Sequence, residues 1–259
     1  MKLSIMLVCM VALAAACHQT SSPSEQANQA ISDLVIENVK GQVVQLETDI
    51  YLVDSASGKM GKLESKSIEI YSNGYDTSYS YYTASDSSTT VSVYGHNANG
   101  YTTSMTTTKK GKPVSSMQLV VDSAGHYTLA TSFDSTGKMD TYYDSILSNN
   151  YRQVIAAKGH HVDSTLKMTF TNTYDSVYYT GAESKDSVGK LTYLSVIKLN
   201  DNNEPMQMDE TVVTKDSTKK TITTYTYDGW DKQGNWTQQT AFEKGIPKKM
   251  MRRIITYKP

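Results

Sequence analysis

The chain has 259 residues, a formal net charge of −1 and 38% hydrophobic residues. The absence of a basic surplus gives no electrostatic case for nucleic-acid binding, and the low apolar fraction argues against a large helical or doubly wound core. Tyrosine is abundant, with 19 residues against three phenylalanines. Because tyrosine and threonine suit the half-wet surface of a strand, the composition favours antiparallel sheet.

Residues 1–16 predict an export signal, because a charged start precedes an apolar run too short to span a bilayer. The segment Leu13–Cys17 resembles a bacterial lipobox, in which the cysteine is lipidated and becomes the mature N-terminus. It departs from that pattern at Ala14, where leucine is commoner. An ordinary signal peptide cut after Ala16 is the alternative. Cys17 would be the only cysteine of the mature chain, and a lone thiol in an oxidising compartment favours lipidation.

Residues 17–34 are expected to form a lipidated, polar tether with one short helix. The helix is predicted from Ser24, the N-cap, to Asp33, with an apolar stripe. The stripe consists of Ala27, Ala30, Ile31 and Leu34. By resemblance to Gram-negative sorting patterns, His18 after the cysteine indicates the outer membrane.

Residues 35–259 are predicted to form one all-β domain. Turns such as Tyr71–Gly74 and Val121–Gly125 recur about every 25 residues, with lysine–glycine turns such as Asp134–Lys138 between them. The segments between turns alternate, as in Tyr127–Phe133. Short turns without crossover helices predict consecutive antiparallel hairpins, a meander in which strand order follows chain order. We expect one long curved sheet in a single layer.

The C-terminal unit carries a family resemblance. Its residues 225–236, with Trp236, the turn at Gly245 and the run from Met251 to Tyr257, resemble the YD-repeat-like lipoproteins common in Bacteroidetes. The resemblance covers residues 35–259 but is sharp only in this last unit. It implies stacked hairpins in one long curved sheet, and it implies no activity.

No residue pattern supports catalysis or a metal site. The chain has no Gly-x-Ser-x-Gly sequence and no glycine-rich phosphate loop before a helix. His160 and His161, with Asp163, form the densest group of potential ligands, but adjacent strand residues point to opposite faces, and solvated turn histidines are the alternative. Paired carboxylates such as Asp228 with Asp231 are expected to be solvated. We therefore predict a protein that is not an enzyme and needs no cofactor.

Aromatic residues give the better case for function. We predict a binding surface that includes Tyr79, Tyr81, Trp230 and Trp236, because aromatic side chains on a rigid sheet stack on sugar rings or bury a partner's side chains. The alternative is that tyrosine–threonine ladders simply hold a thin sheet together by cross-strand pairing.

Asp-Ser pairs followed by a small or apolar residue recur along the chain. Aspartate and serine both favour turns by hydrogen bonding to their own backbone. The triplets also resemble the O-glycosylation pattern of exported Bacteroidetes proteins. The candidate acceptors are Ser55, Ser123, Ser135, Ser145, Ser164, Ser176, Ser187 and Ser217.

These observations predict an exported outer-membrane lipoprotein, anchored through an N-terminal lipid, that acts as a binding or structural module for a glycan, peptide or envelope-protein partner. The alternative is a carrier of a lipid or another apolar ligand in the concave face of the sheet. The lining of that face discriminates between them, since a contiguous apolar lining favours the carrier and a Tyr/Thr/Ser lining favours the binding module.

Overall fold

The computed structural model describes residues 31–54 and 57–259. The described chain contains a short helix, α2 (Asp33–Ile36), and sixteen strands. The first eight strands are β1 (Val43–Val53), β2 (Met60–Ser72), β3 (Tyr75–Thr83), β4 (Asp86–His96), β5 (Thr102–Lys109), β6 (Lys112–Val121), β7 (Tyr127–Phe133) and β8 (Met139–Ser148). The others are β9 (Val154–His161), β10 (Leu166–Asp175), β11 (Tyr178–Asp186), β12 (Leu191–Leu199), β13 (Pro205–Val213), β14 (Thr218–Trp230), β15 (Trp236–Glu243) and β16 (Ile246–Tyr257).

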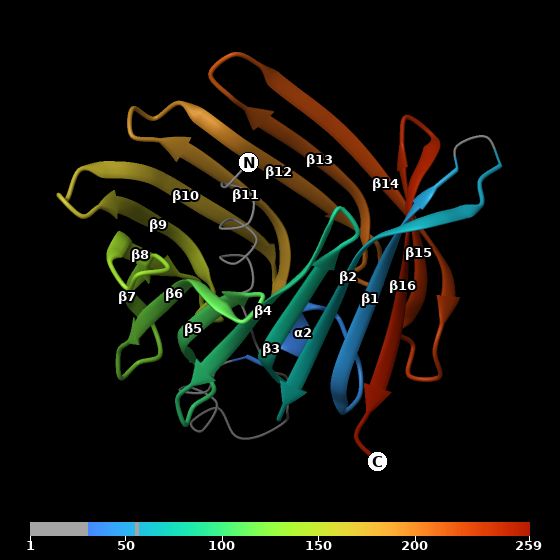
Figure 1. The fold of residues 1–259 in the computed structure, drawn as a ribbon, viewed down its shortest axis with the longest axis horizontal. Helices are drawn as coiled ribbons and strands as arrows, with labels where there is room; N and C mark the ends of the chain where they lie inside the picture. Colours follow the sequence, from blue (N-terminus) through green and yellow to red (C-terminus); the bar gives the residue numbers. More distant parts are fainter. Residues whose placement is uncertain (1–30, 55–56) are drawn as a thin grey trace.

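The strands form a closed antiparallel barrel (Figure 1). Each strand pairs with its neighbours in the chain, so the predicted meander and its strand order are confirmed. The prediction of an open curved sheet is wrong, because β1 also pairs with β16, with partners from Val43 and Tyr257 to Leu52 and Lys249. A twisted sheet of this length brings its first and last strands together, and closure pairs the backbone groups that two open edges would leave exposed.

Asparagine and aspartate shape many of the connecting turns. In the β6–β7 turn, Asp122 Oδ1 accepts hydrogen bonds from the backbone N–H of Ala124 at 2.8 Å and of His126 at 2.9 Å, and Gly125 has a positive φ of 85°. Asp186 and Asn200 accept the same pair of bonds in their turns. The predicted turn chemistry of these residues is therefore confirmed.

Residues 31–42, here called the base strap, cross one end of the barrel. We call this end the base; the C terminus lies there too (Figure 1). Ser32 Oγ donates a hydrogen bond to the carbonyl oxygen of Gly74 at 2.8 Å, and Asn38 Nδ2 donates to that of Asn202 at 2.7 Å. Lys40 N donates to Asn235 Oδ1 at 2.7 Å. The strap thus joins the β2–β3 turn to the β12–β13 and β14–β15 turns.

The helix predicted over residues 24–33 lies largely outside the described residues. Helix α2 begins where that prediction ends, at Asp33. Among the described residues, no helix has the length and apolar character needed to cross a membrane.

Apolar packing is concentrated on the inner face of the barrel. Leu34 and Val39 of the strap pack against Val43, Leu46 and Tyr71 of β1 and β2. A second cluster covers β5–β10 and the turns at their base ends. Its buried members are Tyr101, Met105, Met117, Leu119, Tyr127, Ala130, Tyr143, Val154, Ala157 and Phe170.

Candidate functional site

The strand register identifies which side chains face the barrel interior. Residues directly opposite each other on antiparallel strands share a face. Leu46, which packs against the strap, lies opposite Ile255 and Glu69, so these three residues face inward. The same register, followed around the ring, places these residues on the inner face: Tyr79, Ser92, Thr107, Met117, Ala130, Tyr143, Phe170, Ala182, Ser195, Glu210, Thr221, Gln239 and Arg253.

Hydroxyl groups line much of this face above the apolar cluster. Ser92 Oγ and Thr107 Oγ1 lie 3.0 Å apart, and Ser132 Oγ donates to the carbonyl oxygen of Thr141 at 3.1 Å. All four side chains are buried. Serine and threonine hydroxyls can both donate and accept, so these bonds satisfy the buried polar groups of the wall.

The wall formed by β12–β14 adds tyrosines and a carboxylate. Tyr193, Glu210 and Tyr225 face inward and are half-buried. Burial, with the charge of Glu210, raises the pKa of Tyr225 to about 12, and burial also raises the pKa of Tyr193. Both phenols are therefore neutral hydrogen-bond donors at neutral pH. A sixteen-stranded barrel is wide enough for an aqueous interior, and half-buried side chains on its inner wall fit that width.

Carboxyl groups gather where the strap meets the wall. Tyr71 Oη lies 2.6 Å from Glu69 Oε2 and 3.1 Å from Glu37 Oε2 of the strap. Asp33 Oδ2 accepts a hydrogen bond from the backbone N–H of Asp76 at 2.6 Å. Burial raises the pKa of Asp33 to about 6, and burial with the charge of Glu69 raises that of Asp76 to about 8. Burial and the neighbouring Glu69 raise the pKa of Glu37 well above its usual range.

Arg253 supplies positive charge to this region. Its guanidinium carbon lies 3.8 Å from the centroid of the Trp236 ring, and its charge favours ionisation of Glu37 and Glu204. Its buried Nε and Nη1 atoms have no hydrogen-bond partner among the described residues. Glu204 accepts a hydrogen bond from Asn38 Nδ2 at 2.8 Å. Sequence reasoning missed this group of residues, because they lie far apart in the chain and form no local motif.

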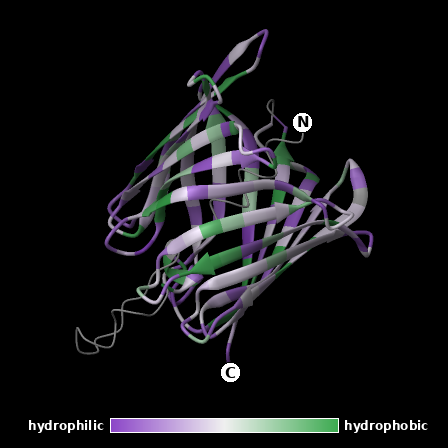
Figure 2. Ribbon diagram, turned by 90° about the vertical axis from the view of Figure 1, so that its left-hand side faces the viewer, coloured by the Kyte–Doolittle hydropathy of each residue, from purple (hydrophilic) through white to green (hydrophobic). Residues whose placement is uncertain are grey.

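The outer face carries charged residues at mid-strand positions. Lys66 Nζ lies 2.7 Å from Glu47 Oε1 and 3.3 Å from Asp49 Oδ1 across β1 and β2. Lys185, near the end of β11, pairs with Glu183 of the same strand at 2.5 Å. Figure 2 shows hydrophilic residues along the lengths of the strands, and not at the turns alone. This outer face therefore contains many groups that prefer water.

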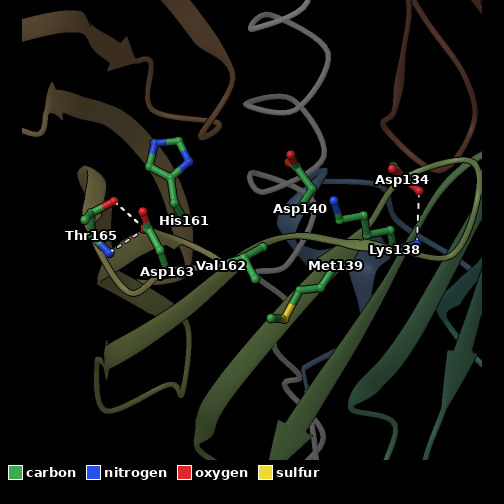
Figure 3. Close-up of a pocket in the computed structure, with 8 residues that line it drawn as sticks. All are labelled: Asp134, Lys138, Met139, Asp140, His161, Val162, Asp163 and Thr165. Atoms are coloured by element: carbon green, nitrogen blue, oxygen red, sulfur yellow. Dashed lines mark hydrogen bonds between the residues drawn. The ribbon is translucent and has the colours of Figure 1, made fainter.

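The opposite end of the barrel, the tip end, has a pocket of about 600 Å³ between the β7–β8 and β9–β10 turns (Figure 3). Most of the residues that line it are polar or charged. The lining residues are Asp134, Lys138, Met139, Asp140, His161, Val162, Asp163 and Thr165. Asp134 and Asp163 stabilise the turns in which they lie, since each accepts hydrogen bonds from the threonine two residues later in the chain. The bonds from Thr165 hold the pKa of Asp163 below its usual range.

The two adjacent histidines separate as expected from strand alternation. His161 lies opposite inward-facing Thr141, whereas His160 lies opposite Tyr142 on the outer face. The His160 and Tyr142 rings stack at 5.1 Å, and His160 Nε2 lies 3.2 Å from Asp144 Oδ1. Among the described residues, no group of three or more His, Cys, Asp or Glu side chains is arranged to hold a metal ion.

The four aromatic residues of the predicted surface fall into two groups on different strands. Tyr79 and Tyr81 stack at 6.3 Å on the inner face of β3. Trp230 and Trp236 each lie 5.8 Å from Tyr227, at the β14–β15 turn. Trp236 is only 5% exposed and offers little surface to a partner. Their role in binding stays a prediction.

The predicted glycosylation sites are accessible where the structure describes them. Their side chains are exposed at Ser123, Ser135, Ser145, Ser164, Ser176, Ser187 and Ser217. Ser164 and Ser176 lie in turns and have positive φ values of 66° and 56°. Ser145, with a φ of 50°, lies within β8 where its register with β9 shifts. Ser55, the signal peptide and Cys17 lie outside the described residues.

No family model and no curated protein matches the chain. Among solved structures, a porin-like protein from Bacteroides uniformis has a TM-score of 0.53 at 14% identity, over 83% of this chain and 96% of that one. A porin-like protein from Bacteroides vulgatus scores 0.33 at 12% identity, over 84% and 99%. The Tc holotoxin pore of Photorhabdus luminescens scores 0.31 at 12% identity, over 75% of this chain and 12% of that one.

The similarity to the Bacteroides uniformis protein shows the fold. The two structures with lower TM-scores are too dissimilar to support any inference about this chain. The chain thus folds as a closed antiparallel barrel, similar in fold to the porin-like protein from Bacteroides uniformis. The resemblance to YD-repeat-like lipoproteins gains no support from a family model and stays an interpretation.

Proposed function

We propose that the protein is an exported, non-catalytic binding barrel that stands in water and takes a polar, hydroxyl-rich ligand, of the oligosaccharide class, into its interior. The porin-like fold is consistent with an exported or outer-membrane protein. A lipid on Cys17 would hold the barrel at the membrane.

The observation that carries this proposal is the composition of the inner face. Tyrosine, serine and threonine that are half-buried or exposed recur on it from β2 to β14, including Ser67, Tyr81, Thr90, Thr223 and Tyr225. Tyrosine rings can stack on sugar rings, while neutral hydroxyls donate and accept hydrogen bonds. This is the lining that favours a binding module over an apolar carrier.

The apolar residues of the inner face support the same choice. They are covered, as shown by Tyr143 at 3% and Ala157 at 4% exposure. Side chains packed in this way stabilise the wall and leave little apolar surface for a lipid tail.

A transmembrane pore is the second candidate, because the fold resembles a porin-like protein. The charged residues of the outer face argue against a transmembrane pore. Transmembrane barrels present an apolar band to lipid, and a lysine or arginine on the lipid face costs about 2–4 kcal/mol at the bilayer midplane. Here Lys66, Lys158 and Arg252 face outward from mid-strand positions.

The test is oligosaccharide binding by the mature full-length chain, first on a glycan array and then by titration calorimetry with a ligand from that array. Tyr225→Ala and Tyr193→Ala should each weaken binding about tenfold, the equivalent of about 1.4 kcal/mol. Tyr142→Ala, on the outer face, is the matched control and should bind as the wild type does. Ion conductance across planar bilayers, or binding unaffected by both inner substitutions, would overturn the proposal.

A further inference from the structure

The contact between the base strap and β2 requires a proton. Tyr71 Oη lies within hydrogen-bond distance of both Glu69 Oε2 and Glu37 Oε2, at 2.6 and 3.1 Å. A tyrosine hydroxyl has a single hydrogen, and an ionised carboxylate can only accept. Both contacts can therefore be hydrogen bonds only if one of the two glutamates is protonated and donates to Tyr71 Oη.

A further carboxyl group at the base also favours proton uptake. Asp76 Oδ1 is buried without a hydrogen-bond partner among the described residues, a costly position for a charged oxygen.

We propose that the base strap is a proton-dependent closure of the barrel base, docked when Glu37 and Glu69 share a proton and released when that proton is lost. Release would detach α2 from β2 and β3, free Leu34 from its apolar cluster, and open the base to solvent. The interior would then be reached from both ends.

Charged and titratable groups from several elements face the strap. Glu69 and Tyr71 come from β2, Asp76 from β3, His96 from β4 and Arg253 from β16. Tyr127, at the start of β7, lies near enough to Asp33 for that charge to raise the tyrosine's pKa. Among the described residues named here, His96 favours ionised Asp33 and Arg253 favours ionised Glu37, but Arg253 also faces Glu204. Ionisation of these carboxyl groups therefore leaves a negative excess in a buried place.

The sign of the pH effect follows from the raised pKa values. Docking raises the pKa of Asp33 to about 6 and that of Asp76 to about 8, and it raises that of Glu37 well above its usual range. The docked state thus binds more protons than the released state. Docking is strongest below the ordinary carboxyl range, near pH 4, and weakens as the pH rises through 6 to 8.

Hydrogen–deuterium exchange on the mature full-length chain tests this proposal at pH 5 and pH 8, with rates corrected for intrinsic exchange. The informative amides are those of Glu37, which donates to Asp33 O at 3.1 Å, and Val39, which donates to Leu34 O at 2.7 Å. Their protection should fall about tenfold or more from pH 5 to pH 8, while amides of β10 stay protected.

Glu37→Gln is the decisive variant, because a glutamine amide can donate to Tyr71 Oη, whose own hydrogen then goes to ionised Glu69. Its strap protection should fall less from pH 5 to pH 8 than that of the wild type, and the remaining fall comes from Asp33 and Asp76. Glu47→Gln, on the outer face, is the matched control and should behave as the wild type does. Asp76→Asn is a second variant, expected to reduce the pH dependence if Glu37→Gln fails to fold. Equal protection of the wild-type strap at both pH values, or an unchanged pH dependence in the variants that fold, would overturn the proposal.

Discussion

Leu46→Ala should destabilise the barrel far more than the same substitution six residues further along the strand. Leu46 is 1% exposed and packs between the base strap and the β1–β16 seam, whereas Leu52 of β1 is 45% exposed. Full burial of the removed carbons is worth about 2.4 kcal/mol, at about 0.8 kcal/mol per buried group.

A residual cavity adds to that loss at position 46. Strand ladders on both sides of β1 limit collapse of the neighbours, so the cavity should cost about 1 kcal/mol more. We therefore expect Leu46→Ala to lower the free energy of unfolding by about 3–4 kcal/mol and Leu52→Ala by about 1 kcal/mol or less.

Equilibrium urea unfolding of the mature chain, followed by tryptophan fluorescence, measures both values. Trp236 is a good reporter, because it lies near the same seam beneath Arg253. Equal losses in the two variants would refute the burial of Leu46 beneath the strap and the role of the strap in packing the closed barrel.

Three further predictions concern the anchor, the turns and the strap. Cys17→Ala should release the protein from the membrane fraction with an unchanged circular dichroism spectrum; retention in that fraction would exclude a lipid at Cys17 as the anchor. The delipidated protein from its native host should exceed the mass computed for residues 17–259 by hexose-sized increments, and an exact match would leave turn chemistry as the whole explanation of the Asp-Ser pairs. Arg253→Gln removes the positive charge that favours ionised Glu37, so strap protection in hydrogen exchange should be lost at lower pH than in the wild type; an unchanged midpoint would exclude this coupling.

Local features of the fold were predictable because they depend on neighbouring residues. The alternation in Tyr127–Phe133 and the Asp and Gly residues of the β6–β7 turn specify strands and turns without distant contacts. Antiparallel pairing in chain order followed from the short connections. The alternation of apolar and polar residues is clearest in strands that have one buried face.

Closure of the barrel was not predictable from the same signals. It depends on pairing between Leu46 and Ile255, residues more than two hundred positions apart, and on twist summed over all the strands. A difference in twist of a few degrees per strand decides between an open and a closed sheet. That difference does not change the alternation of apolar and polar residues along the strands, so the sequence pattern cannot reveal it.

The base of the barrel was missed for a related reason. Asp33, Glu37 and Asp76 look like ordinary solvated residues in the sequence, since nothing in their neighbourhood marks them as buried. They come together only when the strap docks against the inner wall. Of the inner tyrosines, Tyr79 and Tyr81 were predicted as binding residues and Tyr225 was not. Only the closed register separates the inward-facing Tyr225 from the outward-facing Tyr142.

Cysteine labelling of the outer face tests most directly whether the barrel stands in water. Thr171 of β10 is exposed on the outer face at mid-strand, and Ser187 is exposed in a turn at the tip end. In native envelope fragments open to both sides, Thr171→Cys and Ser187→Cys should react with a membrane-impermeant maleimide at rates within a few-fold of each other. Protection of Thr171→Cys by about a hundredfold relative to Ser187→Cys would place the outer face in lipid and contradict the account.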